Sequence, residues 1–162
     1  MNELLPLARE VAEALKSRRA SVGVAESSTG GLISAVLLAV PGASAYYLGG
    51  GVIYTMAARR ALLGIPDETL RGMKPLSADY VTLCARTMRE KLGATWGVGE
   101  LGAAGPAGTR YGHPPGISVL AVDGPVTLTR PVETGSPDRE ANMRAFTRAA
   151  LELLLQAVRQ AG

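Results

Sequence analysis

The sequence predicts an α/β domain of three layers, in which a mixed, mostly parallel sheet is covered by helices on both faces. Segments with apolar residues at helical spacing alternate with short β-branched segments, a pattern typical of strands connected through helices. A hairpin signature near the carboxyl end adds antiparallel strands. A chain of 162 residues has the usual size of one domain that buries a core without disulfides or metals. We therefore expect a single domain over residues 1–162.

The first quarter of the chain reads as helix, strand, tight turn and helix. Apolar residues at helical spacing predict an amphipathic helix over 2–19, and a short, partly β-branched run predicts a strand over 21–25. The turn over 25–31 opens onto a second helix. Pro41 and Gly42 end that helix, because proline cannot continue it and glycine accepts the left-handed conformation common just past a helix end.

The middle of the chain supplies a glycine-interrupted strand and three helical segments. We expect a strand over 46–55, where glycines indicate a bulge or a close backbone approach. A helix is expected over 57–63, and Pro66 marks a new helix start. Ser77 is the expected cap of a longer helix with Cys84 on its buried face, so we interpret Cys84 as a core residue.

The last part of the chain predicts three strands and the final helix. A short strand over 95–98 leads into a glycine-rich stretch, 99–108, which we expect to be a loop. Two β-rich runs, 117–122 and 126–132, form the hairpin. Apolar residues at helical spacing then predict a helix over 137–160.

Composition narrows the possible functions. The single cysteine and single histidine weigh against disulfides, histidine triads and most transition-metal sites, so we expect no bound metal and no resident cofactor. No apolar run reaches the roughly 18 residues of a membrane span, and the N-terminus lacks the layout of a secretory signal, which predicts a cytoplasmic protein without a membrane partner. One Phe and one Trp make a nucleic-acid platform a poor fit, whereas a net charge of +3 suits a small anionic ligand.

The sharpest candidate site is the turn that carries Ser27, Ser28, Thr29, Gly30 and Gly31. Hydroxyls and small residues at a helix N-terminus favour phosphate, carboxylate or an oxyanion, because free backbone N–H groups and the helix dipole point there. The alternative is an ordinary helix cap, since serine and threonine are common at that position.

Two further segments could carry chemistry at strand ends, where ligands of open α/β sheets bind. Tyr54 could position a nucleophile or a carbonyl, and Arg59 could hold an anion; the alternative is a strand tyrosine and a solvated arginine. The stretch 99–108 is either a ligand cradle or a plain connection, because no lysine follows it as in a phosphate loop. His113 is expected in a surface loop.

One long run of residues and three short motifs after it match the pattern of a known protein family. The run VAESSTGGLISAVLLAVPGASAYYLGGGVIY over 24–54 is followed by LLGIP, by GPAG and by SPDR before the final helix. The chain resembles, over nearly its whole length, the C-terminal domain of the CinA (competence and damage-inducible) family, also found as the stand-alone PncC protein. The usual signature of that family is AESCTGG, so Ser28 stands in place of cysteine.

The resemblance implies an amidohydrolase that converts nicotinamide mononucleotide and water into nicotinate mononucleotide and ammonia, and it favours a homodimer. In that family the serine corresponding to Ser27 is the proposed nucleophile, with a tyrosine, matched by Tyr54, and a lysine, whose position holds Arg59. The positions expected to bind the substrate lie in the turn, in the second glycine-rich stretch and in the last helix: Ser28, Thr29, Gly30, Gly31, Gly102, Ala104, Gly105 and Arg144.

The departures from the family pattern fall at positions that carry chemistry. Arginine stays protonated at any reachable pH, so Arg59 could stabilise an alkoxide or bind phosphate but could hardly take a proton from Ser27. In the last helix, an arginine expected four residues after Arg139 is Met143, with Arg144 one place on. The alternative function is therefore a catalytically degenerate relative that binds a nucleotide-sized ligand without turnover.

Overall fold

A five-stranded mixed sheet organises the chain, and the computed structural model describes all of residues 1–162. The strand order is β2-β1-β3-β4-β5. β1 pairs in parallel with β2 and β3, whereas β3–β4 and β4–β5 are antiparallel, so β4 alone runs against the others. The strands are β1 (Val22–Glu26), β2 (Tyr47–Val52), β3 (Trp96–Ala103), β4 (Ile117–Asp123) and β5 (Thr127–Glu133). The predicted fold class is confirmed.

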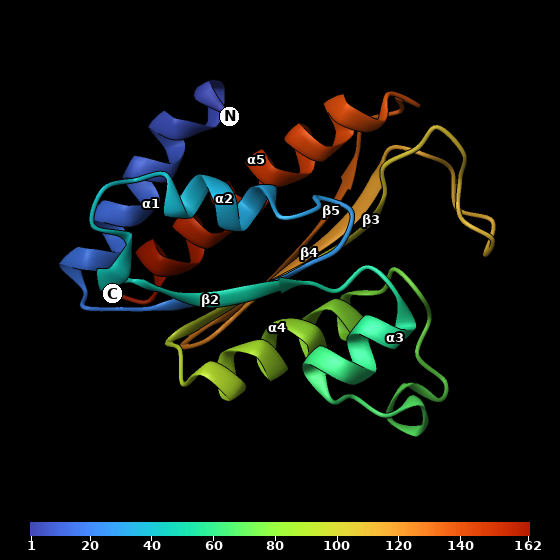
Figure 1. Cartoon of the computed structure of the whole chain (residues 1–162), viewed down its shortest axis with the longest axis horizontal. Helices are drawn as coiled ribbons and strands as arrows, with labels where there is room; N and C mark the ends of the chain where they lie inside the picture. Colours follow the sequence, from blue (N-terminus) through green and yellow to red (C-terminus); the bar gives the residue numbers. More distant parts are fainter.

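Helices cover both faces of the sheet (Figure 1). One face carries three helices that pack on one another, α1 (Leu5–Ser17), α2 (Leu32–Leu38) and α5 (Arg139–Gln160). The other face carries α4 (Ala78–Leu92) and the short α3 (Met56–Ala58), which continues as a π-helical turn over Arg59–Leu63. The larger core of 25 buried residues joins α1, α2 and α5 to the sheet, and two smaller clusters lie under α4. None of the helices is long and apolar enough to cross a membrane.

The helix cap expected at Ser77 is confirmed, and the structure adds a second cap at Asp138. The Ser77 side chain accepts a hydrogen bond from the Tyr80 N–H and so caps α4. Asp138 caps α5 in the same way through the Ala141 N–H. The helix expected at Pro66 is only a 3₁₀ turn over Asp67–Leu70.

One expectation about the sheet is wrong, because β3 continues through residues taken for a loop. It runs from Trp96 to Ala103, and its glycines allow α4 to approach the sheet. A Cβ at Gly97 would lie 2.1 Å from the carbonyl oxygen of Ala85, and one at Gly99 would lie 2.6 Å from that of Val81. These glycines therefore serve helix–sheet packing, and they do not mark a turn.

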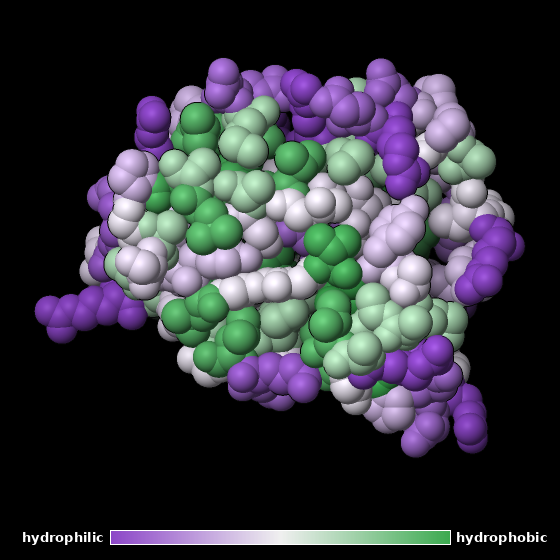
Figure 2. Space-filling view, in the orientation of Figure 1, coloured by the Kyte–Doolittle hydropathy of each residue, from purple (hydrophilic) through white to green (hydrophobic).

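β2 forms one edge of the sheet and leaves apolar side chains in solvent. Leu48 is 46% exposed and Val52 is 42% exposed. Figure 2 shows this side of the molecule with apolar and weakly polar residues across its middle and charged residues around much of its outline. The homodimer expected from the family resemblance stays a prediction.

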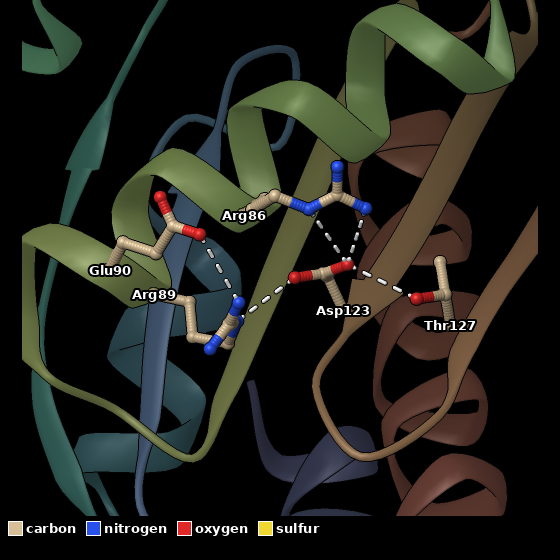
Figure 3. Close-up of polar contacts among 5 residues, drawn as sticks. All are labelled: Arg86, Arg89, Glu90, Asp123 and Thr127. Atoms are coloured by element: carbon tan, nitrogen blue, oxygen red, sulfur yellow. Dashed lines mark hydrogen bonds and ion pairs between the residues drawn. The ribbon is translucent and has the colours of Figure 1, made fainter.

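A buried carboxylate ties α4 to the hairpin of β4 and β5 (Figure 3). Asp123 is 3% exposed. Its Oδ1 accepts hydrogen bonds from Arg86 Nη2 at 3.0 Å and Thr127 Oγ1 at 3.1 Å, and its Oδ2 accepts one from Arg89 Nε at 2.9 Å. Burial by itself raises the pKa of the Asp123 carboxyl, but the hydrogen bonds from Arg86, Arg89 and Thr127 outweigh it and hold that pKa below its usual range.

We expect Asp123→Asn to lower the free energy of unfolding at pH 7 by about 1–3 kcal/mol, the range for charged hydrogen bonds. A carboxyl whose pKa is lowered by folding stabilises the protein above its unfolded pKa of about 3.9, and that stabilisation is lost as the pH falls through the folded pKa. Urea unfolding at pH 7 and at lower pH measures the free energy of unfolding of the wild-type chain and of Asp123→Asn. The difference in this free energy should become smaller in acid. A difference that stays the same at both pH values would contradict this role of the ionised Asp123.

We expect Gly97→Ala to lower the free energy of unfolding by about 1–3 kcal/mol, because the added methyl group meets a backbone carbonyl of α4 that cannot move independently. Gly51→Ala in β2 is the matched control, since its Cβ would first meet the side chain of Ile53 at 3.3 Å. Thermal unfolding of the wild-type chain and of both variants measures the loss of stability at each position. Equal losses of stability in Gly97→Ala and Gly51→Ala would show that the close packing of α4 on β3 is not the cause.

Candidate active site

The turn after β1 is held by a carboxylate from within the chain. Glu26, the last residue of β1, is fully buried. Its oxygens accept the backbone N–H groups of Gly31, Ile33 and Ser34 at 3.0 to 3.1 Å, and the Ser34 hydroxyl at 2.6 Å. Gly30 and Gly31 have φ of 64° and 98°, the left-handed conformations that this turn requires. The N-terminus of α2, expected to attract an external anion, is thus already filled by Glu26.

A second buried carboxylate, Glu100 of β3, fastens the turn from the other side. Glu100 is 3% exposed, and it was missed because its segment was interpreted as a loop. Its Oε2 accepts the N–H of Ser27 at 2.9 Å and that of Thr29 at 3.0 Å, and its Oε1 accepts the Ser28 hydroxyl and, at 3.0 Å, the Ser118 hydroxyl. A lone acid within an apolar and glycine-rich run was the available signal, since such residues are seldom buried without partners.

Thr29 links the two carboxylates. Its hydroxyl lies 2.7 Å from Glu26 Oε2 and 3.0 Å from Glu100 Oε2. A hydroxyl has a single proton and donates to one acceptor at a time. Neither carboxylate forms an ion pair, so hydrogen bonds alone offset the cost of burying them. The polar groups of Thr29 and the left-handed conformations of Gly30 and Gly31 therefore stabilise the turn itself.

A large cavity of about 730 Å³ is lined by the segment after β2, by the π-helical turn and by Tyr80 of α4. Arg59 lines it and is only 3% exposed. Its Nη2 pairs with Asp67, whereas its Nε is buried without any hydrogen-bond partner. Tyr54 also lines this cavity, so the structure brings together the tyrosine and the cation that the sequence singled out.

A smaller cleft of about 230 Å³ is also lined by Tyr54. It gathers several of the predicted substrate-binding positions and one arginine from the start of α5: Ser28, Gly102, Ala104, Gly105 and Arg139. Arg139 donates to the carbonyl oxygen of Gly105 at 2.6 Å and to the Tyr54 hydroxyl at 3.1 Å. The end of β3 and the start of α5 thus form one wall with Tyr54.

Ser27, the candidate nucleophile, is 5% exposed and lines a small pocket of about 10 Å³. Cys84 lines the same pocket; burial raises the pKa of its thiol to about 11, although the Tyr80 hydroxyl and the Arg59 charge act in the opposite direction. Cys84 therefore stays protonated at neutral pH, and its interpretation as a buried core residue is confirmed.

Arg144 does not join these cavities. Its guanidinium pairs with Glu140 and lies 3.6 Å from Glu3, beside the N-terminus of the chain. Arg144 lies five positions after Arg139, and successive helix residues turn by about 100°. The two side chains therefore leave α5 in different directions. Arg144 thus lines neither cavity, and its expected part in substrate binding stays a prediction. No group of three or more metal-ligating side chains lies close enough together to hold an ion.

A family model and the curated relatives of this chain both describe CinA proteins. The family model of the CinA C-terminal domain matches residues 4–158. A CinA-like protein of Prochlorococcus marinus (strain MIT 9313) is 42% identical over 119 residues, which are 74% of this chain and 28% of that protein. A CinA-like protein of Desulfosudis oleivorans is 38% identical over 151 residues, which are 93% of this chain and 37% of that protein. The chain therefore spans about a third of the length of these curated relatives.

Solved structures agree with this assignment. A CinA superfamily protein of Klebsiella pneumoniae 700603 has a TM-score of 0.89 at 29% identity, covering 96% of this chain and 98% of that one. A competence/damage inducible protein of Agrobacterium tumefaciens has a TM-score of 0.88 at 32% identity, covering 97% of this chain and 96% of that one. By sequence and by structure, the chain belongs to the CinA C-terminal domain family.

Proposed function

We propose that this chain binds a mononucleotide of the nicotinamide mononucleotide type across the two cavities that meet at Tyr54. The observation that carries the proposal is Arg59, a buried cation whose Nε has no partner, in the wall of a cavity of about 730 Å³. Ligand pockets of proteins measure roughly 300–1,000 Å³. A buried donor without a partner costs free energy until a ligand atom satisfies it.

The lining of the large cavity suits a phosphate attached to a nucleoside. Lys74 and Arg110 line it together with Arg59, whereas Asp67 is the one acid in the wall. Guanidinium groups bind phosphate oxygens through paired N–H donors. Apolar and aromatic side chains, Tyr80 among them, supply contact area for the sugar and the ring.

Hydrolysis of the ligand's amide, with Ser27 as nucleophile, is the second candidate function, and the family resemblance suggests it. One observation favours it: the Ser27 hydroxyl makes no hydrogen bond within the chain, and its pocket shares Ile53, Tyr80 and Leu101 with the large cavity. A serine nucleophile also needs a base. Arg59 stays protonated and pairs with Asp67, so binding without turnover is the function that the geometry supports better.

We expect nicotinamide mononucleotide to bind the purified chain without release of ammonia. Arg59→Met removes every donor of the guanidinium and should weaken binding about tenfold or more, the effect of losing one charged hydrogen bond. Asp67 keeps Arg60 as a partner in this variant, which favours retention of the fold. Titration calorimetry measures the affinity, and an ammonia assay run in parallel measures turnover.

Ser27→Ala separates the two candidate functions. Under the binding proposal it leaves the affinity unchanged, because Ser27 does not line the large cavity that holds Arg59, Lys74 and Arg110. Ammonia release by the wild-type chain that disappears in Ser27→Ala would establish the second candidate in place of the first. A wild-type chain that neither binds nor hydrolyses the mononucleotide would exclude both.

We expect Arg59→Lys by itself to remain without turnover. Asp67 would pair with the new ammonium group as it pairs with Arg59, and a carboxylate neighbour favours the protonated form of an amine. The same ammonia assay tests this. Turnover gained by the single substitution would show that the arginine alone silences the site.

A further inference from the structure

Arg59 has one satisfied and one unsatisfied donor on the same edge of its guanidinium. In an arginine the Nε–H and one N–H of Nη2 point the same way and can bind an anion together. Arg86 binds Asp123 Oδ1 in this manner, from Nε at 3.3 Å and from Nη2 at 3.0 Å. On Arg59 the Nη2 pairs with Asp67, whereas the buried Nε beside it has no partner. Asp67 therefore occupies only half of this edge.

Asp67 is the one negative charge paired with Arg59. The Arg59 charge also acts on the Tyr80 hydroxyl and the Cys84 thiol, but burial raises the pKa of both groups, so both are uncharged at neutral pH. The Arg59 side chain is 3% exposed and that of Asp67 is 55% exposed. The pair thus joins a buried cation to a carboxylate that water can reach.

Arg60 gives Asp67 a second cationic partner at the surface. Its Nη1 donates to Asp67 Oδ2 at 2.9 Å and to Oδ1 at 3.1 Å, and the Arg60 side chain is 50% exposed. Oδ1 is therefore shared between the buried and the exposed arginine. The carboxylate can leave Arg59 and stay paired with Arg60, so its displacement leaves no unpaired charge behind.

The segment 66–76, which carries Asp67, has few other polar contacts. Apart from the pairs of Asp67, no hydrogen bond joins this segment to the rest of the chain. Its backbone hydrogen bonds outside regular elements are local: Thr69 to Pro66, Arg71 to Glu68 and Met73 to Leu70. A small shift of Asp67 toward Arg60 therefore breaks no other polar contact.

We infer that Asp67 is an internal counter-ion that a ligand phosphate displaces from Arg59 onto Arg60, so that Asp67 sets the affinity of the large cavity for anions. This inference rests on the proposed function and adds to it the residue that regulates binding at that site. Two phosphate oxygens on the edge formed by Nε and Nη2 satisfy the buried Nε and replace Asp67 on Nη2. A carboxylate that stayed on this edge would repel the incoming anion.

Titration calorimetry of the full chain with inorganic phosphate and with nicotinamide mononucleotide tests the inference. Asp67→Asn removes the charge but keeps an oxygen that can accept from an arginine. We expect both probes to bind this variant about tenfold more tightly than the wild-type chain, the factor of one charged hydrogen bond.

Glu68→Gln is the matched control, because it removes the same charge from the next residue of the same turn. Glu68 forms no ion pair and does not line the cavity. Both affinities should stay close to those of the wild-type chain. A gain in Glu68→Gln equal to that in Asp67→Asn would show that net charge alone is responsible and would overturn the inference.

Arg60→Gln separates displacement of Asp67 from direct attraction of the anion. Without Arg60 the displaced carboxylate has no second partner, so we expect both probes to bind about fivefold more weakly. In the Asp67→Asn background the same substitution should have little effect, because no carboxylate remains to be displaced. Arg60 does not line the cavity. A loss of equal size in both backgrounds would contradict displacement.

The outcomes separate this inference from the proposed function. Unchanged or weaker binding by Asp67→Asn, in a wild-type chain that binds the mononucleotide, would overturn the inference alone. Tighter binding of phosphate by Asp67→Asn in a chain that does not bind the mononucleotide would support the inference and overturn the proposed function. Absence of binding of both probes to the wild-type chain and to Asp67→Asn would overturn both.

NMR of the side-chain carboxyl carbons of the wild-type chain needs no variant and so does not depend on how Asp67→Asn folds. The Asp67 resonance should shift as phosphate is added, because the carboxylate exchanges a buried partner for an exposed one. A resonance that stays unchanged at saturating phosphate would overturn the inference.

Discussion

Two buried carboxylates without a cationic partner, Glu26 and Glu100, hold the turn between β1 and α2 in place. An unpaired charge in a protein interior is strongly unfavourable unless hydrogen bonds replace its lost water. Here backbone N–H groups and hydroxyls of the turn supply those bonds, and Thr29 lies between the two acids. The conformation of the turn and the burial of both acids therefore depend on each other, and the position of Ser28 follows from this arrangement.

The glycines of β3 connect this turn with the cavity on the other face. Gly97 and Gly99 allow α4 to pack with its backbone against the sheet, and α4 then forms one wall of the large cavity through Tyr80. β1 and β3 run in parallel, so their carboxyl ends, which carry the turn and the Gly102 segment, meet at one edge. Ligands of open α/β sheets bind at such edges. Tyr54 follows β2, which is also parallel to β1, and it lines both cavities.

Arg59 is the buried cation on which the proposed function rests. Its guanidinium is paired with Asp67, and its Nε has no hydrogen-bond partner. A lysine can lose its proton when buried, whereas an arginine remains a cation and a fixed set of donors. Arg59 is therefore better suited to binding an anion than to taking a proton.

The sequence by itself determined the three-layer α/β class, the order of the elements and most helix ends, because spacing, caps and hairpin signals act over a few residues. It also drew attention to Ser27, Tyr54 and Arg59. Tertiary structure decided that β3 extends to Ala103, that Glu26 and Glu100 fill the anion positions of the turn, and that Ser27 and Ser28 line different pockets. These features depend on which atoms from distant segments come within hydrogen-bond distance. A carboxylate of β3 that lies 73 positions from Ser27 leaves no local pattern around that serine, so only the folded chain could reveal the pairing.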